Sequence, residues 1–200
     1  MKLTIIVPIY NYPDVVKALD SIPQREDIEI LIVDDGSNDE TTDAIAKWVS
    51  KNAHLYITYI RHDNNMGLGA AKNTGYENAC GEYITQLDSD DYLYTDEYNK
   101  VIDQLDGTDI VYIDMRINDG LVFEIDEKSR RGFCSGCARL IRREFLGDLR
   151  CPEIRAGEDW YLSEELLKKN PSEKFTGIVA YHYNYPREGS LYDQMIKGEL

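Results

Sequence analysis

Cysteines and long apolar runs are scarce in this sequence. Its 200 residues include only four cysteines, and a chain of this length buries roughly 70% of its unfolded surface without disulfide bonds or metal ions as staples. No segment approaches the roughly 20 consecutive apolar residues of a membrane-spanning helix. The N-terminal apolar run ends at Pro8, which makes it too short for a secretory signal peptide. We therefore expect a single cytosolic domain.

Basic residues are also scarce, at 22 Lys and Arg against 37 Asp and Glu, so the formal net charge is −15. This balance argues against a nucleic-acid-binding protein, which would present a basic footprint. It also weakens adsorption to anionic lipid. Several arginines nevertheless gather in one segment, and we interpret them either as a basic patch for docking or as solvated surface: Arg130, Arg131, Arg139, Arg142 and Arg143.

Cys134 and Cys137 form a CxxC pair that admits three interpretations. A redox motif would stand near the start of a βαβ unit, and a zinc site would need a second pair of ligands at suitable spacing. Only Cys151 is near, and it has no partner at such a spacing. We therefore favour plain thiols over a redox or zinc site.

Apolar runs and segments with helical spacing alternate through the first ninety residues. Residues 28–33 form an apolar, β-rich run, which is typical of a parallel strand covered on both faces. Asn11 is the expected cap of the first helix, and Gly81 the expected end of the third. The alternation predicts an α/β fold with a parallel sheet and helices on both faces. The expected strands cover residues 3–9, 28–33, 55–61 and 82–87, and the expected helices cover 13–22, 40–50 and 68–80.

The second half of the chain has a different pattern. Asn118, Asp119 and Gly120 are typical of a hairpin turn. We find no internal repeat, low-complexity segment or interdomain linker. The expected helices cover residues 96–105 and 157–169, and the expected strands cover 109–115 and 175–183.

Two acidic turns follow strands of the expected parallel sheet. Asp34 and Asp35 come after the second strand, and Asp88, Asp90 and Asp91 come after the fourth. Because the carboxyl ends of parallel strands share one edge, all five would lie where open α/β sheets bind ligands. Like charges brought together destabilise a fold unless a cation or hydrogen-bond donors offset them. Two carboxylates one residue apart can share a hard cation, and such cations commonly hold phosphates.

Two other motifs compete with this interpretation. An EF-hand calcium loop starting at Asp88 would need Gly at its sixth position, where this chain has Leu93. A dinucleotide fingerprint starting at Gly67 would need a third Gly where Lys72 stands, and the first βα turn has no glycine. The turn at Gly67 can still direct helix N–H groups at an anion. Lys72 would reach a phosphate there or would be a surface lysine.

Glu158 and Asp159 open the expected helix at 157–169. Acidic residues in a first helical turn usually complement the helix dipole. The functional alternative is a general base, because a sugar hydroxyl needs a carboxylate within hydrogen-bond reach to take its proton as it attacks.

Five motifs, in order, resemble family 2 of the inverting, GT-A-type glycosyltransferases. They are VPIYN at 7–11, VDDGS at 33–37, the 65–73 segment with NMG and AKN, GEYI and DSDD within 81–91, and GEDW at 157–160. The resemblance implies a GT-A fold, a Rossmann-like and mostly parallel central sheet flanked by helices, with a smaller acceptor-side C-terminal part. It implies one domain over 1–200, with 1–106 as the nucleotide-sugar-binding half and 107–200 as the acceptor-binding half.

The resemblance implies donor-binding roles in the first half. Pro8 and Tyr10 would line the base pocket, and Asp35 would hydrogen-bond the nucleobase, typically uracil. Lys72 stands where the family usually has Arg, and a lysine at a phosphate loses the bidentate geometry of arginine. Asn73, next to it in the same motif, is a further substrate-binding candidate.

The resemblance also implies metal and catalytic roles. Asp90 would ligate Mn²⁺ or Mg²⁺ on the diphosphate, with Asp88 as a second ligand that also holds the ribose or sugar. Asp91 would support the site. Asp159 would be the general base, with Glu158 shaping the site beside it. The residues implied to close over the diphosphate are Arg187 and Ser190.

The implied reaction is a metal-dependent, inverting transfer of one sugar from a nucleoside-diphosphate sugar, with UDP-hexose as the expected donor. The acceptor would be a hydroxyl of a glycan, a lipid-linked or a protein-linked molecule, in cell-surface polysaccharide or glycoconjugate synthesis. Peripheral contact with the inner face of a membrane stays open, and the sequence does not indicate an oligomeric state. The short chain favours single additions over processive synthesis.

Two alternative functions stay open. A sugar-phosphate nucleotidyltransferase would usually carry a glycine-rich, basic loop after the first strand, where this chain has residues 10–13, YNYP. A non-catalytic nucleotide-sugar-binding module is the other, and the intact Asp90 and Asp159 argue against it. Turnover would separate a binding module from an enzyme.

Overall fold

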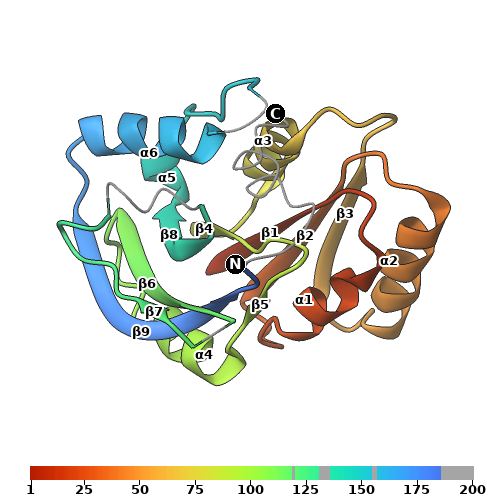
Figure 1. Cartoon of the computed structure of the whole chain (residues 1–200), viewed down its shortest axis with the longest axis horizontal. Coiled ribbons are helices and arrows are strands. Elements are labelled where there is room, and N and C mark those ends of the chain that lie inside the picture. The colour runs from red at the N-terminus through yellow and green to blue at the C-terminus, as the bar shows by residue number, and fades with distance from the viewer. Residues whose placement is uncertain (119, 131–135, 155–156, 186–200) are drawn as a thin grey trace.

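One continuous sheet organises the chain in the computed structural model, which describes residues 1–118, 120–130, 136–154 and 157–185. Within this part the sheet has nine strands in the order β3-β2-β1-β4-β8-β6-β9-β5, and β7 pairs with β6 outside that path. Helices pack along the sheet, and the long strand β9 curves around one end of it (Figure 1).

The N-terminal half forms the expected parallel sheet. β1 (Leu3–Ile9), β2 (Ile28–Asp34), β3 (Tyr56–Arg61) and β4 (Tyr83–Gln86) pair in parallel. Every residue of β1 and β2 is buried, as a continuous apolar run requires. The loops that follow these strands therefore meet at one edge of the sheet. The connecting elements are η1 (Pro13–Val15), α1 (Val16–Asp20), α2 (Asp39–Lys51) and α3 (Leu68–Asn78).

The C-terminal half makes the sheet mixed. β8 is antiparallel to both β4 and β6, and β9 runs parallel to β6 and antiparallel to β5. The direction of β1 to β4 is thus kept by β6 and β9, so the sheet is mostly parallel, as expected. The elements are β5 (Tyr92–Leu93), α4 (Thr95–Asp103), β6 (Ile110–Ile117), β7 (Val122–Phe123), η2 (Gly136–Ala138), β8 (Arg139–Arg142), α5 (Arg143–Leu146), α6 (Glu158–Lys168) and β9 (Glu173–Tyr183).

β6 and β7 form the hairpin expected around residues 118–120, with residue 119 outside the described part. β8 and α5 are absent from the sequence-based prediction. Both are only four residues long, too short to show a clear period of hydrophobicity. Their places are set by pairing with strands far away in the chain.

The predicted roles of Gly81 as a helix end and of Asn11 as a helix cap are both wrong. α3 ends at Asn78 with Ala79 as its C-cap, so Gly81 does not end this helix. A Cβ at Gly81 would lie 2.5 Å from the backbone N of Thr4, and glycine is needed because the chain entering β4 crosses so close to β1. Asn11 does not cap a helix, because its side-chain oxygen accepts the backbone N–H of Asn38 at 2.8 Å instead.

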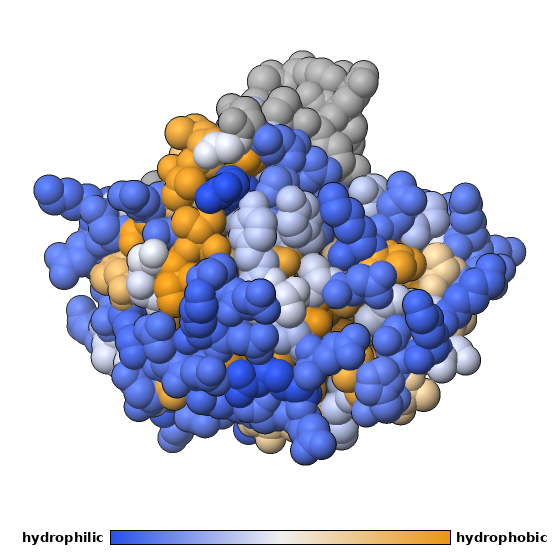
Figure 2. Space-filling model, turned by 90° about the horizontal axis from the view of Figure 1, so that it is seen from below, coloured by the Kyte–Doolittle hydropathy of each residue, from blue (hydrophilic) through white to orange (hydrophobic). Residues whose placement is uncertain are grey.

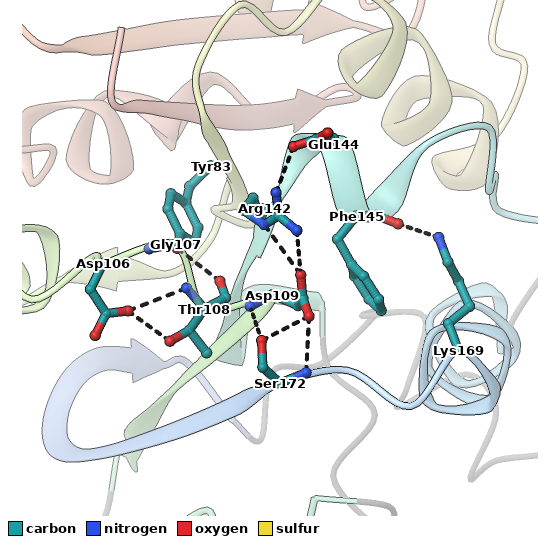
Figure 3. A network of polar contacts seen from close by, with 10 residues as sticks. All are labelled: Tyr83, Asp106, Gly107, Thr108, Asp109, Arg142, Glu144, Phe145, Lys169 and Ser172. Atoms are coloured by element: carbon teal, nitrogen blue, oxygen red, sulfur yellow. Dashed lines mark hydrogen bonds and ion pairs between the residues drawn. The ribbon is translucent and has the colours of Figure 1, made fainter.

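A polar network ties the strands together at the edge opposite the loops that follow β1 to β4 (Figure 3). The carboxylate of Asp109, just before β6, accepts a bond of 2.6 Å from Arg142 Nη2 at the end of β8. It also accepts the backbone N–H and hydroxyl of Ser172, at 2.9 and 2.7 Å, just before β9. The network fixes the relative register of three strands.

The arginines of the segment 130–143 lie in different surroundings among the described residues, and Arg143 is exposed and donates to the carbonyl of Gly81. Arg142 belongs to the network above, Arg130 pairs with Glu173, and Arg139 is only 4% exposed. Arg131 lies outside the described part. The face that carries α4 and β9 is mostly hydrophilic, with a hydrophobic strip along one flank (Figure 2). No helix in the described ranges is long and apolar enough to cross a membrane.

Candidate active site

The end of β2 and the loop after it carry two aspartates with different roles. Asp34 is fully buried, and its oxygens accept the backbone N–H of Ser37 at 2.8 Å and the hydroxyl of Tyr59 at 2.9 Å. Arg61 Nε lies 3.4 Å from the same carboxylate. These partners compensate the buried charge from within the protein, so Asp34 has a structural role.

Asp35, the expected nucleobase ligand, anchors the loop that leads into α3. Its carboxylate accepts the backbone N–H groups of Met66 and Gly67 at 2.9 and 2.8 Å. His62 Nδ1 lies 2.7 Å from the same carboxylate, and its Nε2 lies 2.9 Å from Thr74 Oγ1. A carboxylate offers about four acceptor positions, so Asp35 keeps capacity for one more donor. His62 is not among the residues that the sequence indicated for the site.

Tyr10 is exposed at the carboxyl end of β1, whereas Pro8 is buried within that strand. Hydrogen bonds connect the loop after β1 to the loop after β2, just before α2. Asn11 donates its backbone N–H to Ser37 Oγ at 3.0 Å, and Asn38 donates to the Asn11 side chain. The exposed ring of Tyr10 and the carboxylate of Asp35 thus belong to loops that share one edge, as a base pocket would require.

Residues 88–91, which we call the acidic loop, follow β4 at the same edge. Asp91 is 1% exposed, and it accepts the hydroxyl of Tyr181 at 2.6 Å and the backbone N–H of Asn184 at 2.7 Å. Asp88 and Asp90 are half-buried. Asp91 therefore fastens the acidic loop to the end of β9.

The acidic loop fits a divalent cation. Asp88, Asp91 and Cys137 each offer a ligand atom, and these atoms lie within 4.8 Å of one another. Burial raises the pKa of both aspartates above the usual value, and repulsion from Asp88 adds to the rise at Asp91. A bound cation would offset that cost. Asp90, the expected metal ligand, is outside this cluster and lines the cavity beside it.

That cavity has a volume of about 480 Å³ and lies between the start of the first helix and the acidic loop. Its size suits a small ligand. The residues that line it are Tyr12, Pro13, Asp14, Val16, Lys17, Ser89, Asp90, Asp91 and Asn184. A cavity of about 520 Å³ around Met1, Glu82 and Arg143 lies at the opposite edge, away from every residue of the expected site.

Lys72 occupies the interior between α3 and α6. Its Nζ donates to Glu158 Oε1 and to Asp159 Oδ2, both at 2.8 Å, and the residue is 1% exposed. Burial disfavours the charged lysine, but the carboxylates of Asp159 and Glu158 outweigh it and hold the pKa of Lys72 well above its usual value. The structure thus brings together three expected site residues, although Lys72 is 86 and 87 positions from Glu158 and Asp159 in the sequence.

Asp159, the expected base, is ionised at neutral pH. Burial favours its neutral form, but the positive charge of Lys72 outweighs the effect of burial. The charge of Arg139 acts in the same direction as Lys72, and the pKa of Asp159 lies below the usual value. Its side chain is 22% exposed. Its Oδ1 is buried, and a Cβ added at Gly136 would lie 2.9 Å from this oxygen, so Oδ1 packs against the start of η2.

Asn73 clamps the segment that leads to α6. Its Nδ2 donates to the carbonyl of Cys151 at 2.9 Å, and its Oδ1 accepts the N–H of Cys151 at 2.8 Å. A direct substrate contact by Asn73 would require that clamp to open. Cys151 itself carries a free thiol.

Arg139 is a site residue that the sequence pattern placed in a surface patch instead. Its Nη1 donates to Ser163 on α6, whereas Nε and Nη2 have no hydrogen-bond partner among the residues described. Its charge acts on Asp159. The apolar run 140–141 beside it was the available signal for a buried strand. Arg187, Ser190 and Cys134 lie outside the described residues, so their expected roles stay predictions.

The sheet order, the acidic loop and the carboxylates at the start of α6 define the GT-A class of α/β proteins. The family model for glycosyl transferase family 2 matches residues 4–149. The chain belongs to that family.

Curated relatives agree with this assignment. The chain is 30% identical to the glycosyltransferase GlyA of Streptococcus pneumoniae serotype 4, over 95% of this chain and 31% of GlyA. It is 38% identical to the poly(ribitol-phosphate) beta-glucosyltransferase of Bacillus spizizenii, over 46% of this chain and 15% of that protein. The chain spans less than a third of the length of either relative.

Solved structures share the fold. S. aureus TarS 1–349 in complex with UDP-GlcNAc superposes with a TM-score of 0.77 at 25% identity, over 95% of this chain and 60% of that one. The mannosyltransferase PcManGT of Pyrobaculum calidifontis, in complex with GDP-Man and Mn²⁺, gives a TM-score of 0.74 at 23% identity, over 94% and 58%.

Proposed function

We propose that this chain is a metal-dependent inverting glycosyltransferase that moves one sugar from a nucleoside-diphosphate sugar to an acceptor hydroxyl. The observation that carries the proposal is the position of Asp159 relative to the acidic loop. The charge of Asp159 contributes to the raised pKa of Asp88, after burial and Asp90. A candidate base and a candidate diphosphate site thus lie within electrostatic reach of each other.

Asp159 takes the proton of the acceptor hydroxyl as the oxygen attacks the anomeric carbon. A general base must be ionised before the reaction, and the lowered pKa of Asp159 meets that condition. Attack from the side opposite the departing diphosphate inverts the anomeric centre, so an α-linked donor yields a β-linked product. Glu158 lies beside the base and shares its lysine.

A divalent cation, Mn²⁺ or Mg²⁺, held by the acidic loop would bind the donor's diphosphate. Asp90 and Asp88 are its proposed ligands, with Asp91 in support. When bound, such a cation stabilises the negative charge of the leaving group. Its fit rests on the ligand atoms of Asp88, Asp91 and Cys137, which lie within 4.8 Å of one another.

The proposed donor side is formed by the loops after β1, β2 and β3. Pro8 and Tyr10 border the nucleobase, and Asp35 accepts a hydrogen bond from it with its remaining acceptor capacity. The proposed donor is a UDP-hexose, supported by the UDP-GlcNAc complex of TarS. Residues 1–106 would form the donor half and 107–200 the acceptor half, with Arg187 and Ser190 over the diphosphate.

The proposed setting is cell-surface polysaccharide or glycoconjugate synthesis on a glycan, lipid-linked or protein-linked acceptor. The name of the B. spizizenii relative, a poly(ribitol-phosphate) beta-glucosyltransferase, supports it. A cytoplasmic location at the inner face of a membrane would suit such acceptors.

The first experiment is a thermal-shift panel of UDP, GDP, CDP and TDP with Mn²⁺, Mg²⁺ or EDTA, followed by donor turnover with the best nucleotide. Ligand at about 100 times its dissociation constant adds roughly 2.7 kcal/mol of stability, which is readily detected. We expect a shift with one nucleotide that disappears in EDTA.

The variant that tests the chemistry is Asp159→Asn. It should bind the nucleotide as the wild type does and lose transfer. Asp96→Asn is the matched control, because Asp96 is exposed in the first turn of α4, as Asp159 stands in the first turn of α6. Nucleotide binding without turnover in the wild type would favour a non-catalytic binding module, and equal turnover in Asp159→Asn would refute the assigned base.

A further inference from the structure

The ammonium of Lys72 is the polar link between α3 and the start of α6. It donates to Glu158 and Asp159 at 2.8 Å each, in the protein interior. Asp159 offers Oδ2 to this bond, and its Oδ1 is buried beside Gly136. A bond to one carboxylate oxygen restrains the orientation of the whole group, so the ammonium helps to set the orientation of the Asp159 carboxylate.

Apolar packing holds α6 further along the helix, not at its first turn. The buried apolar residues of α6 are Leu162 and Leu166, one and two turns beyond Glu158. The residue before the helix, Gly157, has φ 90° and makes no side-chain capping bond. The bonds from Lys72 therefore attach the first turn of α6 to α3.

Contact with the donor's phosphates is the competing task for Lys72. An ammonium has three N–H donors, and two of these are committed to the carboxylates of α6. The residue is 1% exposed, so the ammonium would have to leave a buried ion-pair cluster to bind a phosphate. Removing one partner from such a cluster leaves an uncompensated buried charge.

We propose that Lys72 is a positioning residue that orients the carboxylate of Asp159 for the acceptor hydroxyl and compensates the adjacent charge of Glu158. This inference rests on the proposed function, because Asp159 must be the base for its orientation to affect transfer. Lys72 acts through Asp159, so its loss should change turnover far more than it changes donor binding.

The surroundings of Asp159 determine the direction of the effect. Without Lys72, Arg139 would be the cation left to favour the ionised form of Asp159. The negative charges of Glu158 and Asp88 and the burial of the site would favour the neutral acid. Proton affinity at Asp159 should then increase. The charged or titratable groups that face this cluster are Lys72 and Tyr76 on α3, Asp88 after β4, Arg139 on β8, and Cys151 and Glu158 on either side of the turn into α6.

The test compares Lys72→Met and Lys72→Arg with the control Lys168→Met. Lys168 is exposed on α6 and pairs there with Glu165. Lys72→Met should lower kcat about 100-fold, the scale of a misplaced catalytic group. The Kd for UDP with Mn²⁺ should stay within about threefold of the wild type, less than 1 kcal/mol. Lys72→Arg should recover part of the lost kcat, and Lys168→Met should leave both quantities unchanged.

A second readout does not depend on turnover. The ¹³C resonance of the Asp159 carboxyl, followed against pH, should titrate at a higher pH in Lys72→Met than in the wild type. An unchanged titration would overturn the inference, as would a Kd for UDP weakened tenfold or more with kcat intact. A wild type that transfers no sugar would refute the proposed function, while this titration would still decide whether Lys72 controls Asp159.

The wild type provides the measurement if Lys72→Met does not fold. With ¹⁵N-labelled lysine, the Lys72 ammonium resonance should stay in place when UDP and Mg²⁺ are added, because its carboxylate partners are retained. A large shift on adding the nucleotide would assign Lys72 to the phosphates and overturn the positioning role.

Discussion

The hydroxyl of Tyr181 donates a hydrogen bond of 2.6 Å to Asp91, across 90 positions of the chain. Tyr181 is fully buried, and the same hydroxyl accepts the backbone N–H of Asp88 at 3.2 Å. One side chain of β9 therefore holds the first and last residues of the acidic loop. The conformation of the loop depends on a strand from the other half of the chain.

Tyr181→Phe should destabilise the protein. The change deletes the hydroxyl and leaves the buried Asp91 Oδ2 without that donor, which costs roughly 1–3 kcal/mol. Urea unfolding followed by circular dichroism would measure the loss. Tyr56→Phe is a suitable control because Tyr56 is 54% exposed on β3, and an equal effect of both changes would contradict the role given to Tyr181.

Asp90→Ala should abolish the metal dependence of nucleotide binding, because Asp90 is the proposed cation ligand. The expected result in calorimetry is one weak affinity for UDP, the same in Mn²⁺ and in EDTA. Asp96→Ala, at an exposed position of α4, should bind as the wild type does. If Asp90→Ala kept a Mn²⁺-dependent affinity, the cation would be held by the Asp88, Asp91 and Cys137 cluster instead.

Asp109→Asn should reduce stability in a pH-dependent way. Burial raises the pKa of Asp109, but Arg142 and Ser172 outweigh burial and lower it below the usual value. A carboxyl with a depressed folded pKa stabilises the fold above its unfolded pKa of about 3.9, and that contribution is lost as the pH falls through the folded value. We expect a loss of roughly 1–3 kcal/mol at pH 7.

The difference between Asp109→Asn and the wild type should shrink as the pH falls below the unfolded pKa of about 3.9 and through the lower folded pKa, where the wild-type carboxyl is protonated. Urea titrations at several pH values would measure it. Asp148→Asn, at an exposed position near α5, serves as the control. A difference that did not depend on pH would mean that the charge of Asp109 does not stabilise the network shown in Figure 3.

Gly81→Ala should be more destabilising than Gly107→Ala. The new Cβ at Gly81 would lie 2.5 Å from Thr4 N and 2.6 Å from Leu3 C, both backbone atoms of β1. Overpacking of this kind costs typically about 1–3 kcal/mol. Gly107 has φ +96°, and a Cβ added there would meet no atom within 4 Å, so its substitution reports backbone strain alone. Thermal unfolding of both variants gives the comparison, and a smaller effect at Gly81 would contradict the close crossing.

The fold of the first ninety residues could be predicted because its signals are local. β1 and β2 are mostly apolar and buried throughout, and the acidic turns come at the ends of β2 and β4, so parallel pairing brings Asp35 and the acidic loop to one edge. The five motifs also led to the correct family.

The interior of the site could not be predicted in the same way. The partners of Lys72 are 86 and 87 positions away, and no periodicity reports a contact at that distance. Arg139 stands in a four-residue strand with an arginine at each end, so its composition resembles a solvated segment. Its burial follows from pairing with β4 and β6, which is decided by tertiary structure.

α3 connects the two ends of the proposed reaction. Asp35 holds the N-cap of this helix through the N–H of Gly67, and Lys72, little more than one turn later, holds the carboxylates of α6. A substitution of Asp35 that altered nucleobase preference would also shift the helix that carries Lys72. Nucleotide selectivity and turnover should therefore change together. A variant with an altered nucleobase preference would need compensating changes on α3 or α6 to restore its kcat.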